Sequence, residues 1–254
     1  MKGKLHTLQR NWDELGRRDP MWSILSLPEK KDNRWQTDEF FRTGEQEIKQ
    51  LIQSLESLSC NPPRAKALDF GCGAGRLTQP LASYFDEVFG VDIAPSMIDF
   101  ANRHNRHPEQ CRFIVNESAD LKMFSDDEFG LIYSNIVLQH IPPAYTRNYL
   151  REFLRILSPR GILVFQLPSG GRVFDDSGML NLRGLGIRIL PRFFLDLASR
   201  LNGPGRGPRM EMYWTPRSKV IRFLERNGAR VLHVAADNSV ENKWTSYRYY
   251  VAKS

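Results

Sequence analysis

Three glycines at alternate positions follow an acid at the end of an apolar segment, in the run from Asp69 to Gly75. Glycine allows the main chain to turn sharply and leaves room for a ligand to lie against it. Between a buried strand and a helix, such a loop presents free N–H groups to a bound molecule. The dinucleotide-binding pattern G-x-G-x-x-G requires a third glycine at position 76, where this chain has Arg76. In addition, the Asp69 carboxylate would repel a pyrophosphate but attract an ammonium group. The loop therefore predicts a nucleoside ligand with a cationic group and no phosphate.

A second acid, Asp92, ends the next apolar segment, residues 87–92. At the corresponding strand end of a doubly wound sheet, an acidic side chain accepts hydrogen bonds from ribose hydroxyls. A ribose, a cationic amino-acid portion and the lack of a phosphate together describe S-adenosylmethionine. The alternative for the loop alone is a glycine turn in an ordinary α/β protein, and Asp92 at this spacing argues against it.

These segments resemble those of class I S-adenosylmethionine-dependent methyltransferases, which include many small-molecule methyltransferases, and the resemblance covers roughly residues 68–167. It implies that Asp92 binds the ribose, that Ile93 lies beside the adenine, and that an acid in residues 118–121 meets the adenine amino group. The fourth strand and its exit, residues 131–142, would lie along the methionine portion. The cofactor-binding residues implied by the resemblance are Asp69, Gly71, Cys72, Gly73, Gly75, Arg76, Asp92, Ile93, Ala119, Asp120, Leu121 and Asn135. The donor would be S-adenosylmethionine and the product S-adenosylhomocysteine.

The positioning scaffold is predicted to be a doubly wound, Rossmann-like α/β fold with seven strands, mostly parallel with an antiparallel last strand. Residues 1–64 are predicted to form an N-terminal helical region that covers the pocket. Residues 65–254 are predicted to form the methyltransferase domain, with residues 170–214 as a cap insertion after the fifth strand. Beyond residues 87–92, later strands are predicted at residues 112–115, 129–135, 162–167, 231–234 and 246–251.

Helices are predicted from apolar periodicity and end signals. Residues 45–58 place Ile48, Leu51 and Leu55 on one helical face. Thr37 is the predicted N-cap of a helix within the N-terminal region. The remaining predicted helices comprise residues 77–85, 95–107, 145–157, and a last one with Thr215 as cap, Pro216 as first residue and residues 227–228 as its end.

Two segments are candidate walls of the pocket. The insertion, residues 170–214, leaves from the ligand-binding edge of the sheet, so we expect either a lid over the acceptor or a surface loop with one short helix near residues 193–201. Residues 34–44 combine aromatic and charged side chains with a glycine. They are either a closing segment over the cofactor or a helix that packs its aromatic side chains into the core.

The net charge of +7 is concentrated outside the central part of the chain. Residues 65–169 hold ten basic and twelve acidic side chains, whereas residues 170–214 hold seven arginines against four acids, and residues 215–254 hold eight basic against three acidic side chains. Arginine suits carboxylate or phosphate, so this distribution predicts a small, anionic acceptor, with a solvated basic surface as the alternative. Nucleic acid fits the same charge, but no recognition module is visible, which disfavours it. An RNA or protein acceptor and a non-catalytic S-adenosylmethionine-binding module remain open alternatives.

Methyl transfer from a sulfonium is an in-line displacement to an oxygen or nitrogen, so orienting the acceptor and excluding water supply most of the rate. A hydroxyl acceptor also needs a general base, and His140, which follows the fourth strand, is the candidate. The alternative is a histidine that packs beside the next helix and bonds to the backbone. No cluster of metal-ligating residues is visible, so metal-independent chemistry is predicted.

The cysteines Cys60, Cys72 and Cys111 are odd in number and lack metal-ligand spacing, as expected of reduced thiols in a cytoplasmic protein. No apolar run reaches the roughly 18–20 residues that span a bilayer, and the first residues lack the apolar stretch of a secretory signal. The sequence therefore predicts a cytoplasmic enzyme without a membrane span, and it predicts no particular oligomeric state.

Overall fold

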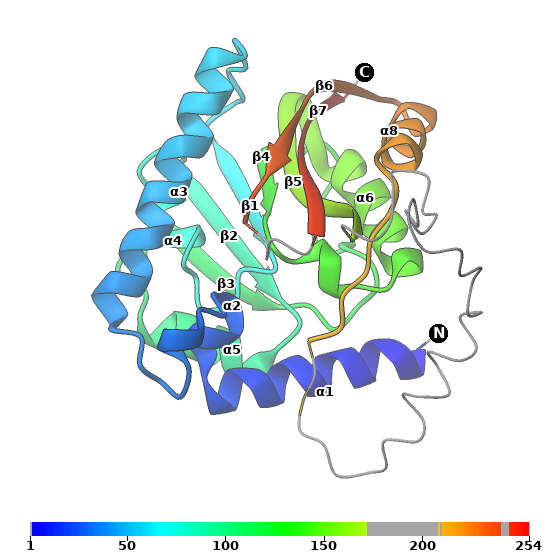
Figure 1. Ribbon diagram of the computed structural model, residues 1–254. Coiled ribbons are helices and arrows are strands. Elements are labelled where there is room, and N and C mark those ends of the chain that lie inside the picture. Colours follow the sequence, from blue (N-terminus) through cyan, green and yellow to red (C-terminus); the bar gives the residue numbers. More distant parts are fainter. Residues whose placement is uncertain (1, 172–207, 209, 240–243, 254) are drawn as a thin grey trace, which may run out of the picture.

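The computed structural model describes residues 2–171, 208, 210–239 and 244–253. In this part of the chain, seven strands form one sheet in the order β3-β2-β1-β4-β5-β7-β6 (Figure 1). The strands are β1 (Lys66–Phe70), β2 (Glu87–Asp92), β3 (Cys111–Val115), β4 (Phe129–Ser134), β5 (Leu157–Gly171), β6 (Ala229–Asp237) and β7 (Trp244–Lys253). Pairs among β1 to β5 are parallel, and β7 is antiparallel to both of its neighbours. The predicted fold class is confirmed.

The helical elements are α1 (Lys2–Arg18), α2 (Pro20–Ile24), the short η1 (Pro28–Lys30), α3 (Thr37–Ser57), α4 (Thr78–Leu81), α5 (Pro95–Arg103), η2 (Leu138–His140), α6 (Pro143–Ile156) and α8 (Arg217–Arg226). Figure 1 shows α3 on one side of the sheet and α6 with α8 on the other. Apolar side chains on the α3 side include Ile48, Leu51 and Leu55, which are at most 2% exposed. Phe153 and Leu224 are fully buried on the other side. The sheet is thus covered on both faces, as a mostly parallel sheet requires.

The strand order reverses at β1, which pairs with β2 on one edge and with β4 on the other. Chain connections therefore leave β1 and β4 in opposite directions and open a crevice beyond their carboxyl ends. Ligands of doubly wound sheets bind at such a reversal. Asp69 is in register with Gly90 and with Tyr133, so the strand ends that carry the glycine loop, Asp92 and Asn135 lie next to one another.

The aromatic side chains of residues 34–44 pack into the protein. Trp35, Phe40 and Phe41 are at most 5% exposed and form a cluster with Met21 of α2 and with Ala74 of the glycine loop. Of the two alternatives for this segment, the structure supports core packing. The same contacts bring the N-terminal region against the loop.

Several element boundaries differ from the prediction. The helix expected at residues 77–85 is helical only from Thr78 to Leu81, because the chain continues in tighter turns whose N–H groups bond to carbonyls three residues earlier. Two predicted helix starts differ from the structure by one position. The N-cap of α3 is Gln36 and not Thr37, and Pro216 is the N-cap of α8 and not its first residue. β5 begins at Leu157 rather than at residue 162, because residues 158–161, between the predicted helix and the predicted strand, form a bulge inside the strand, with Arg160 at φ +64°.

Other features concern the whole described part. None of its helices combines the length and apolar composition needed to cross a membrane. The three cysteines are unpaired. The larger part of the predicted cap insertion, residues 172–207 and 209, lies outside the described residues, as does the short helix expected near residues 193–201.

Candidate active site

The glycine loop connects β1 to α4 and is fixed to the next strand. Gly71, Gly73 and Gly75 have φ values of +78°, +50° and +77°, a region that side-chain-bearing residues rarely adopt. The N–H groups of Gly71 and Cys72 donate to the carbonyl oxygen of Val91 in β2, at 2.7 and 3.1 Å. These bonds fix the loop against the end of β2.

Neighbouring side chains also leave no room for a side chain at these glycines. A Cβ atom at Gly73 would lie 2.6 Å from Cδ1 of Ile24, and one at Gly75 would lie 2.7 Å from Cζ of Phe113. A Cβ atom at Gly71 would collide with Val137. Ile24 ends α2, so the N-terminal region packs directly on the main chain of the loop.

Asp69 is 1% exposed, and its Oδ2 accepts a hydrogen bond from Oγ1 of Thr78 at 2.7 Å. Burial raises the pKa of Asp69 to about 7, although the bond from Thr78 acts in the opposite direction. The side chain therefore ties the end of β1 to α4 across the loop. The contact with a ligand ammonium group remains a prediction.

Asp92 joins the two sequence motifs. Its Oδ2 accepts from the N–H of Gly73 and its Oδ1 from the N–H of Ala94, both at 2.9 Å. Burial raises the pKa of Asp92, while these main-chain N–H groups lower it. Each carboxylate oxygen has a second lone pair, so the group retains capacity to accept from two hydroxyls.

The predicted adenine-side residues follow β3 and lie against α6. The N–H of Asn116 donates to the carbonyl of Asp92 at 2.8 Å, which brings this segment beside the end of β2. Leu121 is fully buried, and its N–H donates to Glu152 at 2.9 Å. Asp120 accepts from Ser118 at 2.9 Å.

Ile93 and Ala119 are partly buried against the core cluster that contains Leu121. Burial acts to raise the pKa of Asp120, but the bonds from Ser118 and Lys122 outweigh it, so its pKa is lowered and the side chain is ionised. Two predicted apolar neighbours of the cofactor and one predicted acid thus occupy the same end of the sheet.

Arg76 and Asn135 meet at a carboxylate that sequence reasoning missed. Glu47 of α3 accepts from Nη2 of Arg76 at 2.8 Å, and from the Tyr133 hydroxyl and Nδ2 of Asn135 at 2.7 Å each. Burial acts to raise the pKa of Glu47, but the charge of Arg76 and the bond from Tyr133 hold it below its ordinary value. The approach of α3 is possible because Gly44 lies directly on the main chain of Arg76.

A cavity of about 530 Å³ opens beside Arg76 and Asn135, between α3 and the ends of β6 and β7. Arg248 of β7 lines it and pairs with Asp237 at 2.8 Å. The Nε atoms of Arg76 and Arg248 are buried and have no hydrogen-bond partner among the described residues. The wall combines polar and apolar residues, and its uncharged polar members include Thr43, Gln46, Gln50, Ser54, Asn238 and Ser239.

His140 is 8% exposed and lies in a chain of hydrogen bonds that runs to β7. Its Nδ1 lies 2.7 Å from the carbonyl of Glu211 and therefore carries the proton, because a carbonyl only accepts. Its Nε2 then accepts from Gln139 at 3.1 Å, and the oxygen of Gln139 accepts from Gln166. Burial lowers the pKa of His140 to about 4, although the bond to Glu211 acts to raise it.

These contacts give His140 the features of the alternative, a packed histidine that bonds to the backbone. Tyr213 reinforces the attachment, since its N–H donates to the carbonyl of Gln139 at 2.6 Å. The pair of bonds fastens the segment that precedes α8 to the exit of β4. The role of His140 as a general base remains a prediction.

The helix α1 spans the carboxyl edge of the sheet (Figure 1). Near its end, the Asp13 carboxylate accepts from the N–H of Ser96, at the start of α5, at 2.8 Å. Gln9 donates to Glu117, after β3, at 2.6 Å, and the Trp12 ring lies 5.0 Å from that of His140. One helix thus contacts the exits of β2, β3 and β4.

Two further properties bear on the chemistry. Burial raises the pKa of the Cys72 thiol well above its ordinary value, so this residue of the loop is not a thiolate near neutral pH. Within residues 2–171, 208, 210–239 and 244–253, no group of three or more His, Cys, Asp or Glu side chains could hold a metal ion.

Comparison with known proteins is consistent with this geometry. The family model for a methyltransferase domain matches residues 68–165. Nodulation protein S of Rhizobium tropici is 30% identical over 146 residues, which cover 57% of this chain and 58% of that protein. Trans-aconitate 2-methyltransferase of Variovorax paradoxus is 32% identical over 130 residues, 50% of this chain and 48% of that protein. The chain therefore spans about half the length of these curated relatives.

Among solved structures, magnesium protoporphyrin IX methyltransferase from Synechocystis PCC 6803 with bound S-adenosylhomocysteine has a TM-score of 0.64 at 17% identity, over 98% of this chain and 99% of that one. This likeness concerns the fold, which is the fold that the strand order above describes. Residues 68–165 thus match the model of a methyltransferase domain, and the chain has the fold of this S-adenosylhomocysteine-bound methyltransferase structure.

Proposed function

We propose that this protein transfers a methyl group from S-adenosylmethionine to an oxygen or nitrogen atom of a small, anionic molecule. The observation that carries the cofactor assignment is the bond between Asp92 and the N–H of Gly73. It unites the acid at the end of β2 with the glycine loop in one cradle, at the point where the strand order reverses. The cradle fits a nucleoside because Asp92 keeps lone pairs for two ribose hydroxyls.

Seven of the predicted cofactor-binding residues have roles in this proposal. Asp92 binds the ribose, and Ile93 and Leu121 border the adenine, with Asp120 at its amino group. The main chain at Gly71 and Gly73 lies against the amino-acid portion, while Asp69 keeps the loop attached to α4. S-adenosylmethionine supplies an activated methyl group, and the protein contributes orientation and the exclusion of water.

The acceptor class is argued from the cavity of about 530 Å³. Arg76 and Arg248 line it, and each retains a buried Nε–H group without a partner among the described residues. A buried donor without an acceptor is costly, so an acidic oxygen of the acceptor is the favoured occupant. The name of the trans-aconitate relative, an enzyme for an anionic substrate, supports this class of acceptor.

An anionic acceptor also agrees with the environment of His140. With a pKa of about 4 and both ring nitrogens in hydrogen bonds, its imidazole is a weak base near neutral pH. A carboxylate oxygen needs no general base, because it is already ionised at pH 7. We therefore favour a carboxylate as the methyl-accepting group, and a positioning role for His140 through the segment that precedes α8.

The N-terminal region, residues 1–64, is proposed to be the cover of the cofactor site. Its contacts at Ser96, Glu117 and His140 follow the carboxyl edge of the sheet, and Ile24 lies against Gly73. Such a cover excludes water from the reacting groups. Residues 65–254 would then form the methyltransferase domain, with the cap insertion of residues 170–214 as a second wall on the acceptor side.

The test is methyl transfer from labelled S-adenosylmethionine to a panel of di- and tricarboxylates, with their neutral amides as matched controls. We expect transfer to acids only. Arg248→Met should raise KM for the acid about tenfold or more, since a hydrogen bond to a charged group contributes about 1.5–3 kcal/mol. Arg222→Met, at an exposed position on α8, is the charge-matched control.

Three other results would each contradict part of the proposal. Equal transfer to the neutral amides would remove the anionic acceptor. Transfer only to RNA or to a protein would identify a macromolecular acceptor. Tight binding of S-adenosylmethionine without transfer to any acceptor would indicate a binding module that lacks catalysis.

A further inference from the structure

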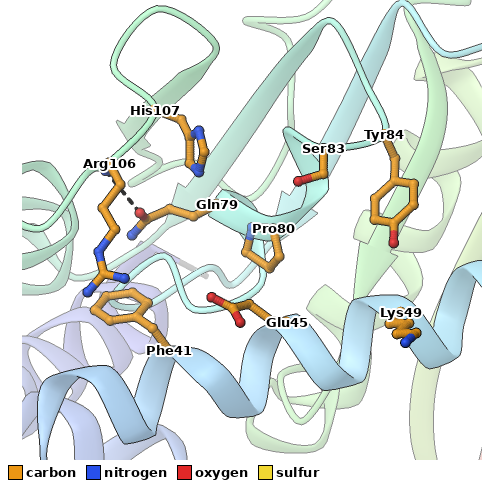
Figure 2. Close-up of a pocket in the computed structure, with 9 residues that line it drawn as sticks. All are labelled: Phe41, Glu45, Lys49, Gln79, Pro80, Ser83, Tyr84, Arg106 and His107. Carbon is orange, nitrogen blue, oxygen red and sulfur yellow. Dashed lines mark hydrogen bonds between the residues drawn. The ribbon is translucent and has the colours of Figure 1, made fainter.

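The helix α3 borders two separate cavities on its two flanks. Its central stripe is buried in the protein and comprises Phe40, Gly44, Ile48, Leu51 and Leu55. One flank, which includes Thr43 and Glu47, faces the candidate active-site cavity. The opposite flank presents Phe41, Glu45 and Lys49, spaced one helical turn apart, to a second cavity of about 330 Å³ (Figure 2).

The other wall of the second cavity comes from α4, from the turn after it and from the loop after α5. The residues that contribute are Gln79, Pro80, Ser83, Tyr84, Arg106 and His107 (Figure 2). The main-chain N–H of Gln79 donates to Gly75 at 3.2 Å, so this wall begins directly behind the glycine loop. None of the lining residues belongs to the glycine loop or to the end of β2, so the cavity is distinct from the cofactor cradle.

Gln79 supplies a buried donor at this cavity. The residue is 4% exposed, and its Oε1 accepts from the N–H of Arg106 at 3.0 Å (Figure 2). This bond fixes the orientation of the amide and leaves Nε2 as a donor. Nε2 is buried and has no partner among the described residues. Buried polar groups are almost always hydrogen-bonded, so an acceptor atom of a ligand would satisfy this donor.

Other polar side chains that line the cavity also lack hydrogen-bond or ion-pair partners among the described residues. Within the described residues, the side chains of Lys49, Ser83 and His107 form no hydrogen bond or ion pair, and neither does Glu45. Arg106 pairs with Asp38 at 2.5 Å and lies 5.6 Å from the Phe41 ring. The hydrogen-bond donors that line the cavity thus outnumber its one acidic side chain, Glu45. Glu45 is one helical turn from Lys49 but is not paired with it.

We propose that this second cavity is a binding site for a small oxyanion, a carboxylate or a phosphate monoester, that also carries a hydroxyl or amino group. The oxyanion accepts from Nε2 of Gln79, Glu45 accepts from the hydroxyl or amino group of the ligand, and Lys49, one turn beyond Glu45 on α3, contributes its positive charge (Figure 2). The site lies apart from the methyl-transfer cavity, so its occupancy does not depend on the acceptor.

The experiment is calorimetric titration of the full chain with glycerate, glycerol 3-phosphate and glycerol. The two acids separate a carboxylate from a phosphate source, and glycerol is the neutral control. We expect at least one acid to bind and glycerol not to bind. Binding should be equal with and without saturating S-adenosylhomocysteine, because the two sites are separate.

Variants test the residues. Lys49→Met should weaken the bound acid about tenfold or more, equivalent to about 1.4 kcal/mol. Gln79→Glu should weaken it at least as much, because it keeps the acceptor for the N–H of Arg106 and removes the donor. Arg42→Met removes a charge from the same helix outside both cavities and should leave binding unchanged.

The proposal is overturned by any of three results. The first is no binding of either acid, and the second is binding of glycerol as strong as that of the acids. The third is wild-type affinity in Lys49→Met, a surface substitution on α3 that is not expected to affect folding. Methyl transfer is expected to persist in Lys49→Met, so failure of this proposal is distinguishable from failure of the proposed function.

Discussion

Replacement of Asp69 by asparagine tests two effects of this buried acid: its effect on the free energy of unfolding and its effect on S-adenosylmethionine binding. The ordinary pKa of the side chain is 3.8 and burial raises it to about 7. Each factor of ten in proton affinity corresponds to about 1.4 kcal/mol, so ionising Asp69 in the folded protein costs about 4 kcal/mol. Asparagine acts as a permanently neutral substitute, because its oxygen still accepts from Thr78.

The sign of the pH dependence follows from the raised pKa. The stabilising contribution of a protonated Asp69 is complete below about pH 3.8 and is lost as the pH rises to about 7. Between about pH 5 and about pH 8 the wild-type protein should therefore lose about 2 to 3 kcal/mol that the Asp69→Asn variant does not lose. Equilibrium denaturation in urea at both pH values measures this difference. Asp99→Asn is the same change at an exposed position on α5, and this variant should lose as much stability between the two pH values as the wild-type protein does.

The same variant tests why an acid stands at this position. If the Asp69 carboxylate attracts the ammonium group of the cofactor, S-adenosylmethionine should bind more weakly to Asp69→Asn, and the wild-type protein should release a proton on binding near pH 6.5. Proton release is measured by calorimetry in buffers of different ionisation enthalpy. An unchanged pH dependence of stability in the variant would refute the burial argument, and unchanged affinity would refute the ammonium contact.

Three further substitutions test the network around the cradle. Asp92→Asn should weaken S-adenosylmethionine binding about ten- to a hundredfold by calorimetry, since hydrogen bonds to a charged group contribute about 1.5–3 kcal/mol; unchanged affinity would remove the ribose role. Glu47→Gln should lower the free energy of unfolding by about 3–5 kcal/mol, because it leaves the buried Arg76 guanidinium without its charge partner. This contribution of Glu47 is complete above the ordinary pKa of 4.5 and is lost as the pH falls below it, so a wild-type stability that does not decline in acid would argue against it. His140→Gln should keep at least about a tenth of wild-type turnover, whereas a loss of about 10²–10⁴ in a folded variant would establish it as the general base.

The cradle could be predicted from sequence because its parts are local. The glycine loop and Asp92 each belong to a short segment with a strong pattern, and the strand order of a doubly wound sheet brings the two together without further information. The structure adds how they are joined, through the N–H of Gly73. The aromatic residues 34–44 could only be narrowed to two alternatives, because a closing segment and a core helix need the same composition.

The partners of the predicted residues could not be found in this way. Glu47 is separated from Arg76 by 29 positions, and on its helix it resembles any polar residue beside an apolar stripe. Arg248 and Asp237 form an ion pair only because β6 and β7 lie side by side. The environment of His140 likewise depends on Glu211, which lies near the end of the predicted insertion. Pairing across elements is set by tertiary packing, which a single sequence does not encode in a local pattern.

The hydrogen bonds of the loop also determine which part of the site has to move for a ligand to enter. Gly71, Cys72 and Gly73 donate to Val91 and Asp92, so their main chain is already ordered and loses little conformational freedom on binding. Ile24 is different, because it lies against Gly73 from outside the loop and is held there by a five-residue helix. We therefore expect the packing of α1 and α2 on the sheet edge to oppose the entry of a ligand. Substitutions at Asp13 or Trp12 should change the rate of cofactor association, while substitutions in the loop should change the rate of its dissociation.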